Sequence, residues 1–221
     1  MGDRTRSDGR TPARAQTGPS ARGQAHTLEA VAAALLLISA VVFALQVTAV
    51  TPLSGSTSNQ HIENQQGNAA SDVLESAARN GTLRPTLLHW NHSAEPEGRF
   101  HGASREGYRS GMPPTTFGDT LEALFLERGI AVNVELYYTR SDNRRGSIPL
   151  VYLGEPSDHA SPASWFVTLL EDDELRDASG TPSVTTVAEA DAAGSFYADP
   201  DTTRDSPVFN VVEVEVTLWR L

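Results

Sequence analysis

Residues 30–50 read AVAAALLLISAVVFALQVTAV, and this run decides how the rest of the chain is interpreted. Its 21 residues include no charged side chain, and its only polar members are Ser39, Gln46 and Thr48. A helix rises about 1.5 Å per residue, so the run spans about 31 Å, close to the thickness of a bilayer core. Backbone groups in lipid must find partners within their own segment, which a helix provides. The run therefore predicts a transmembrane helix.

The charges on either side of the run predict its orientation. Residues 1–23 carry five arginines against two aspartates, a net charge of +3, whereas residues 51–80 carry three acids against one arginine, a net charge of −2. Because positive flanks stay in the cytoplasm, we expect a single-pass protein of the lipid bilayer with a cytoplasmic N-terminus and an extracellular C-terminal domain. Residues 1–23 are also rich in Gly, Pro, Ser and Thr, which predicts a disordered leader.

A cleaved secretory signal peptide is the first alternative, because Val47-Thr48-Ala49 offers small residues at a cleavage position. The apolar run of such a peptide has 7–15 residues, which is shorter than the run observed here. No twin-arginine motif precedes the run either. We therefore expect the helix to remain on the protein.

The residues before the run, RGQAHTLE at 22–29, resemble a class III signal of archaeal type IV pilins. In that family a basic and a small residue precede the cleavage site, and the apolar helix follows it. The resemblance implies processing at Arg22, Gly23 and Gln24 by a prepilin peptidase, with cleavage after Gly23 or after Gln24. It also implies that Glu29 acts in assembly with other pilin-like subunits and that residues 24–50 form a pilin-like N-terminal segment. The open alternative is an uncleaved anchor with Glu29 in the headgroup zone.

Composition excludes several classes of protein. The 221 residues carry 28 acids and 17 basic residues, a net charge of −11, which excludes an electrostatic nucleic-acid binder. All the basic residues are arginine, and this bias together with the acid excess is typical of a high-salt, high-GC proteome. There is no cysteine, so disulfides, thiolate metal sites and cysteine nucleophiles are excluded.

The part beyond the membrane run predicts an α+β domain. Residues 51–80 are interpreted as a connector, with a break at 51–59 and an amphipathic helix at 60–79. The domain itself, 81–221, opens with a Gly- and Pro-rich loop at 81–118, in which 86–90 is the only ordered element expected. A capping box at Asp119 and Glu122 predicts a second short helix that ends at Gly129.

Alternating apolar residues predict five strands, which hairpin-length connections join into one antiparallel sheet with both helices on one face. The expected strands are 131–138, 148–153, 164–170, 183–188 and 208–219. The last strand has the longest alternation and is expected at the centre of the sheet. The strand aromatics are expected in the core, and they are Tyr137, Tyr138, Trp165, Phe166 and Trp219.

Two groups of residues have the composition of metal ligands, and we expect neither to bind a metal. The first comprises His89, His92, His101, Glu95 and Glu97 in a Gly- and Pro-rich segment, without the defined geometry of a zinc site. The second is the acidic run 171–174 with Asp177, which lacks the spacing of a calcium loop. No cofactor motif and no catalytic motif is present, so the sequence predicts a protein that is not an enzyme.

Two glycosylation sequons, at Asn80 and Asn91, lie on the side expected to be extracellular. The whole chain is similar in plan to uncharacterised haloarchaeal single-pass membrane proteins that open with a pilin-like helix. That resemblance implies a non-catalytic structural or assembly protein of the cell surface. The alternative is a permanently anchored binding module whose loop 81–118 contacts a partner.

Overall fold

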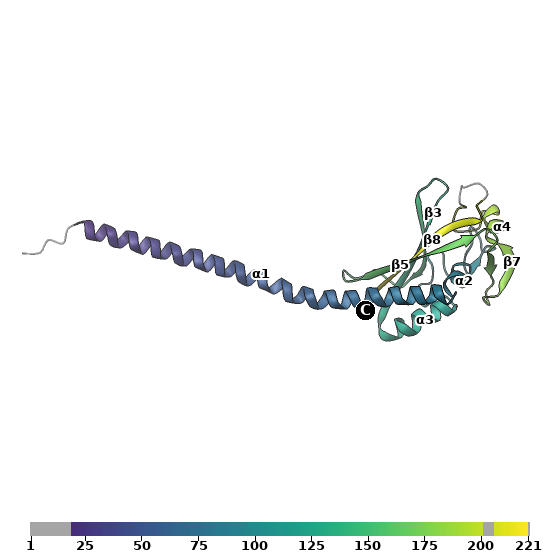
Figure 1. The fold of residues 1–221 in the computed structure, drawn as a ribbon, viewed down its shortest axis with the longest axis horizontal. Coiled ribbons are helices and arrows are strands. Elements are labelled where there is room, and N and C mark those ends of the chain that lie inside the picture. Colours follow the sequence, from purple (N-terminus) through teal and green to yellow (C-terminus); the bar gives the residue numbers. More distant parts are fainter. Residues whose placement is uncertain (1–18, 201–205, 221) are drawn as a thin grey trace, which may run out of the picture. The chain divides into compact units, whose positions relative to one another are not determined.

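The computed structural model describes residues 19–200 and 206–220, and within these the side chains of 26–45, 64–200 and 206–220. The chain divides into two compact units, Met1–Ser56 and Thr57–Leu221, and each is described by itself. The expected α+β class is confirmed: an apolar N-terminal helix is followed by antiparallel sheets and a few short helices. Figure 1 gives the order of these elements along the chain.

Helix α1 covers Pro19–Arg79 and begins inside the stretch expected to be disordered. Residues 1–18 of that leader lie outside the described residues, but 19–23 are helical. Proline suits the first position of a helix because the N–H that it lacks has no helical partner there. The break expected at 51–59 is also wrong, since this backbone is helical. An internal proline removes one hydrogen bond and need not end a long helix.

A four-stranded antiparallel sheet forms the centre of the second unit, in the order β4-β3-β8-β5. The strands are β3 (Ile130–Thr139), β4 (Arg145–Tyr152), β5 (Ser161–Leu170) and β8 (Val208–Arg220). The central position of β8 is confirmed, because it pairs with β3 on one side and with β5 on the other. Its alternate residues Val212, Val214, Val216 and Leu218 are fully or almost fully buried, as the alternation predicts.

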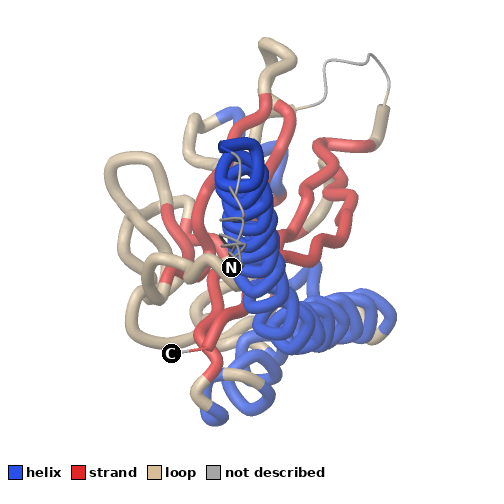
Figure 2. The backbone as a smooth tube through the Cα atoms, turned by 90° about the vertical axis from the view of Figure 1, so that its left-hand side faces the viewer, coloured by secondary structure: helices blue, strands red, loops and turns tan. Residues whose placement is uncertain are grey.

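Helical residues join the inward face of this sheet in one core. The end of α1 contributes Ala70, Val73, Leu74 and Ala77, and α3 (Thr116–Leu124) contributes Phe117 and Leu121. A short 3₁₀ helix, η1 (Leu126–Arg128), follows α3 and ends at Gly129, as expected. The other face of the sheet carries half-buried polar residues, so one face is dry and one meets solvent, as antiparallel sheets allow. Figure 2 shows the helices and strands in a second view.

The start of α3 differs from the expected capping box at Asp119. Thr115 is the N-cap, and its hydroxyl accepts a hydrogen bond from the backbone N–H of Gly118. Asp119 lies instead in the first turn of the helix. Threonine and aspartate both cap helices, and the sequence TTFGD offers both, so the pattern alone could not separate them.

The strand expected at 183–188 is also wrong as part of the main sheet. Residues Pro182–Thr186 form β7, which pairs only with β6 (Glu174–Arg176), and α4 (Val187–Ala192) follows at once. A capping box stops the strand, because Thr186 and Glu189 exchange side-chain to backbone hydrogen bonds of 3.2 and 3.0 Å.

The segment 81–118 is more ordered than expected. It contains α2 (Leu83–Leu87) and a small antiparallel ribbon of β1 (Trp90–Asn91) and β2 (Arg99–Phe100). Large buried side chains tie it to the core, among them Leu83, Leu87, Leu88, Trp90 and Phe100. The glycines and prolines of this segment therefore shape turns between packed residues.

Candidate functional site

The apolar part of α1 is the first candidate site. His26–Leu45 is long and apolar enough to cross a membrane, and none of it is buried. Glu29 interrupts this surface near its N-terminal end; its carboxylate is exposed and lies 3.7 Å from Nδ1 of His26. The backbone of Arg22, Gly23 and Gln24 is helical, and their side chains lie outside the described part. Processing at these residues and assembly through Glu29 stay predictions.

The two sequons differ in accessibility. Asn80 directly follows α1, is exposed, and its side-chain amide donates a hydrogen bond of 3.3 Å to the Ser76 hydroxyl. Asn91 lies in β1 and is half-buried, and its side-chain oxygen accepts a hydrogen bond of 3.1 Å from the backbone N–H of Ser93. A glycan therefore meets less obstruction at Asn80.

An aromatic cluster holds the segment 81–118 against the end of α4. The ring of Trp90 packs edge-on against Phe100 and Tyr197, with centroids 4.9 and 5.2 Å away. Its indole N–H donates to the carbonyl of Ser195 over 2.6 Å, so the buried polar end of the ring is satisfied. These rings form one wall of a cavity of about 470 Å³, which Arg99 and Arg105 also line.

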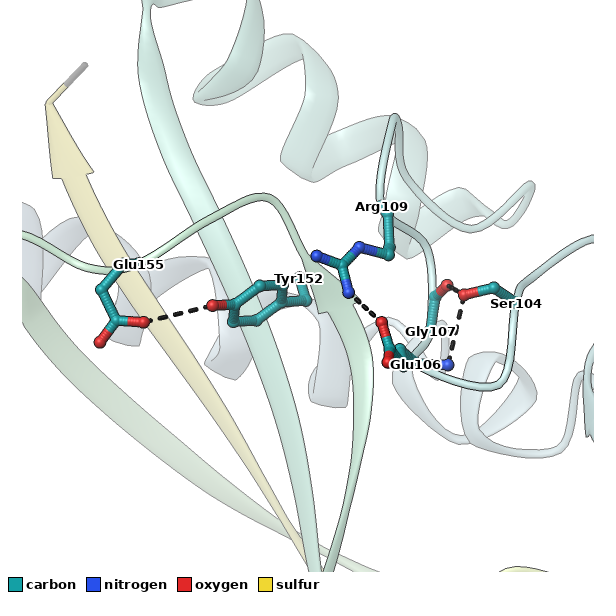
Figure 3. Close-up of polar contacts among 6 residues, drawn as sticks. All are labelled: Ser104, Glu106, Gly107, Arg109, Tyr152 and Glu155. Carbon is teal, nitrogen blue, oxygen red and sulfur yellow. Dashed lines mark hydrogen bonds and ion pairs between the residues drawn. The ribbon is translucent and has the colours of Figure 1, made fainter.

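Figure 3 shows how the next turn of this segment rests on β4. The guanidinium of Arg109 pairs with Glu106 and lies 5.0 Å from the ring centroid of Tyr152, whose hydroxyl donates to Glu155. Gly107 has a φ of +79°, and a Cβ there would lie 2.6 Å from the Pro149 carbonyl oxygen. Only glycine fits such a position, so this turn is held close to the strand. These contacts position the loop and include no nucleophile with an adjacent base.

His89 and His101 come together, as the metal alternative required, with ring centroids 4.9 Å apart. His89 is 1% exposed, and its ring nitrogens have no hydrogen-bond partner of normal geometry among the described residues. Burial is the main cause that lowers the pKa of both imidazoles. His101 lowers the pKa of His89 further, and His92 lowers that of His101 further, whereas Asp177 opposes both shifts and the backbone at Arg176 opposes the shift of His101. Within the described residues, no three His, Asp or Glu side chains gather as metal ligands.

The acidic run serves local structure. The Asp173 carboxylate accepts a hydrogen bond of 2.8 Å from the backbone N–H of Leu170 and pairs with Arg84 over 3.2 Å. The Asp177 carboxylate accepts hydrogen bonds from the Ser179 hydroxyl and from the backbone N–H groups of Thr181 and Ser179, and these bonds hold the pKa of its carboxyl below the usual value. Both carboxylates stabilise turns at the ends of β5 and β6.

The core assignment of Trp165 and Phe166 is wrong, and Tyr137 is half-buried beside Arg145 outside the core. Trp165 and Phe166 on β5 are 37% and 64% exposed, whereas Trp219 is 4% exposed. The reason is topological: β5 is the outermost strand on its side of the sheet. Residues 161–170 carry no charge, which is typical of a buried strand, so the local sequence did not signal this exposure.

A family model matches residues 22–218, which include the apolar part of α1 and all four strands of the main sheet except the end of β8. The chain belongs to DUF7288, a family of unknown function. The DUF7288 match therefore covers both the apolar helix and the sheet domain. The comparisons with curated proteins and with solved structures gave no match.

Proposed function

We propose that this DUF7288 protein is a pilin-like structural subunit of a haloarchaeal cell surface, anchored by α1 and without catalytic activity. One observation carries the proposal. The apolar surface of His26–Leu45 is wholly exposed, while Leu74 of the same helix is completely buried in the domain core. An apolar helix of this length needs a bilayer or neighbouring helices around it, and a filament core provides the second of these.

The position of Glu29 supports assembly through α1. An acid at the edge of an apolar helix is costly in lipid unless a positive group lies beside it. Cleavage after Gly23 creates a free α-amino group at Gln24, and this group on a neighbouring subunit is a partner for Glu29. The net charge of +3 on residues 1–23 supports a cytoplasmic leader within reach of a prepilin peptidase and an extracellular domain.

The experiment is mass spectrometry of the N-terminal peptide from membrane-extracted protein, in cells with and without the prepilin peptidase. We expect the protein to begin at Gln24 or Ala25 only when the peptidase is present. A start at residues 1–3 in both strains contradicts the proposal.

Glu29→Gln tests the assembly step separately. We expect normal cleavage but loss of subunit–subunit crosslinks in this variant. Glu75→Gln is the matched control, because Glu75 lies on the same helix in an exposed pair with Arg79. Equal crosslinking in both variants contradicts a role for Glu29.

The alternative function is a permanently anchored binding module with an uncleaved N-terminus. The cavity lined by Trp90, Phe100 and Arg99 favours it, because aromatic walls with a few charged groups are typical of ligand sites. An unprocessed N-terminus in the experiment above is the result expected for this function.

A further inference from the structure

Strand β5 presents a free edge. It pairs with β8 along Ser161–Leu170, and within the described residues no strand pairs with its other side. The opposite outer strand, β4, is covered: Tyr108 donates its backbone N–H to Leu150 over 2.9 Å and accepts from Tyr152 over 2.8 Å. The β4 edge of the sheet therefore has a backbone partner in Tyr108, whereas the β5 edge has no strand beside it among the described residues.

The middle of β5 lacks the usual protection of a free edge, because Pro162 lies at its start and the register shift between Leu169 and Leu170 lies at its end. Natural edge strands avoid pairing with other chains by carrying charges, bulges or prolines. The sequence SPASWFVTLL has no charge, and its one proline is Pro162, near the start. Trp165 and Phe166 are exposed at the middle of the strand.

A groove of about 710 Å³ runs along this edge. Trp165, Phe166 and Val167 all line it, although consecutive strand residues point to opposite faces. A groove that touches both faces lies beside the backbone of the strand. Leu83 and Leu88 line the groove as well, so its wall beyond β5 has an apolar part beside the charged residues at one end. An extended segment placed here meets the outer edge of β5 along Trp165, Phe166 and Val167, before the Leu170 backbone, which Asp173 occupies, and finds apolar surface for alternate side chains.

The charges at one end of the groove indicate the chemistry of that segment. Asp172, Asp173 and Glu174 line it just beyond the end of β5, against Arg84 and Arg176. Arg84 is already paired with Asp173. Because the sheet is antiparallel, the N-terminal end of an added strand lies at these acids. A basic residue fits there, whereas a second copy of the uncharged β5 brings none.

We propose that the free edge of β5 binds an extended segment of a partner protein by strand addition, with apolar side chains at every second position and a basic residue at the N-terminal end. This inference goes beyond the pilin-like function and does not depend on cleavage of the leader. Backbone pairing supplies the affinity, and the groove and the acids select the sequence.

Trp165 makes the binding measurable in the full chain held in detergent. The other two tryptophans, Trp90 and Trp219, are 3% and 4% exposed, so iodide quenching of fluorescence reports mainly on Trp165. The probe is a synthetic peptide, Arg-Thr-Val-Thr-Val-Thr-Val. We expect saturable protection from iodide, and at least about tenfold weaker binding when glutamate replaces the peptide's arginine. Absence of protection at millimolar peptide overturns the proposal.

Two further peptides test the backbone pairing. Each is N-methylated at alternate residues, one set at the odd positions and one at the even positions, so that each loses the donors of one edge. We expect one to bind like the unmodified peptide and the other to fail. Equal binding by all three shows a side-chain contact only and overturns strand addition.

Phe166→Ser tests the site on the protein, with Val184→Ser on β7 as the matched control, because Val184 is 95% exposed and does not line the groove. We expect at least about tenfold weaker binding for Phe166→Ser and no change for the control. Iodide protection that grows with protein concentration, without peptide, assigns the edge to a second copy and overturns the proposal.

Discussion

Single residues decide how closely segment 81–118 packs, and Gly98 is the clearest example. It has a φ of +79°, and a Cβ there would lie 2.6 Å from the Ser195 oxygen and 2.7 Å from Trp90 Nε1. We expect Gly98→Ala to lower the free energy of unfolding by about 2–4 kcal/mol, because it adds a clash to the backbone strain. The measurement is the urea midpoint of the detergent-solubilised chain.

Gly102→Ala is the control for this change. Gly102 has nearly the same φ, +77°, but nothing lies within 4 Å of the position of its Cβ. Backbone strain alone applies there, with a cost of about 1 kcal/mol. Equal losses for the two variants would show that the Trp90 contact does not restrict position 98.

His89 makes the stability of the domain depend on pH. The pKa of His89 is lowered in the folded protein, mainly by burial. At a pH below the ordinary imidazole pKa of about 6.5, the unfolded chain therefore binds more protons than the folded one. Stability is therefore unaffected above that value and falls as the pH drops from about 6.5 through the folded pKa. We expect His89→Leu to reduce the loss of urea midpoint between pH 7.5 and pH 5.

The matched control is His159→Gln, a change at an exposed histidine outside this cluster. We expect it to keep the acid sensitivity of the original chain. His101 shares the lowered pKa, so part of the acid loss remains in His89→Leu. An unchanged pH dependence in His89→Leu would contradict the assignment.

Among the elements, α3 tests the corrected cap. The Thr115 hydroxyl oxygen accepts a hydrogen bond from the backbone N–H of Gly118 and a second one, of 2.9 Å, from the Thr86 hydroxyl. We expect Thr115→Ala to cost about 1–2 kcal/mol, because both bonds are lost. Asp119→Ala removes only an exposed first-turn acid and should cost less than about 1 kcal/mol. The measurement is the urea midpoint of each variant. A larger loss for Asp119→Ala than for Thr115→Ala would show that Asp119 is the cap.

Local patterns predicted the strands well where packing agrees with alternation. The run 208–219 predicted β8 almost to the residue and also its central place. The alternation at 183–188 was outweighed by the Thr186 capping box, which turns the chain into α4. The burial of Trp165 was predicted from its residue type, but exposure follows from the order of strands, which no local pattern contains.

At the scale of the whole molecule, the sequence predicted the α+β class and the apolar helix, because each depends on a long periodic or uniform run. The candidate sites were harder to predict from the sequence. His89 and His101 are separated by eleven residues and meet only through the pairing of β1 with β2. The groove beside β5 joins residues from 78 to 176, so it exists only after the sheet has formed.

Helix α1 has a mechanical consequence. The same helix, Pro19–Arg79, carries the exposed apolar stretch and the buried Leu74. A pull on the apolar stretch is therefore transmitted along this helix to a side chain in the core of the domain. The domain can bear force only as long as the turns around Leu74 stay wound.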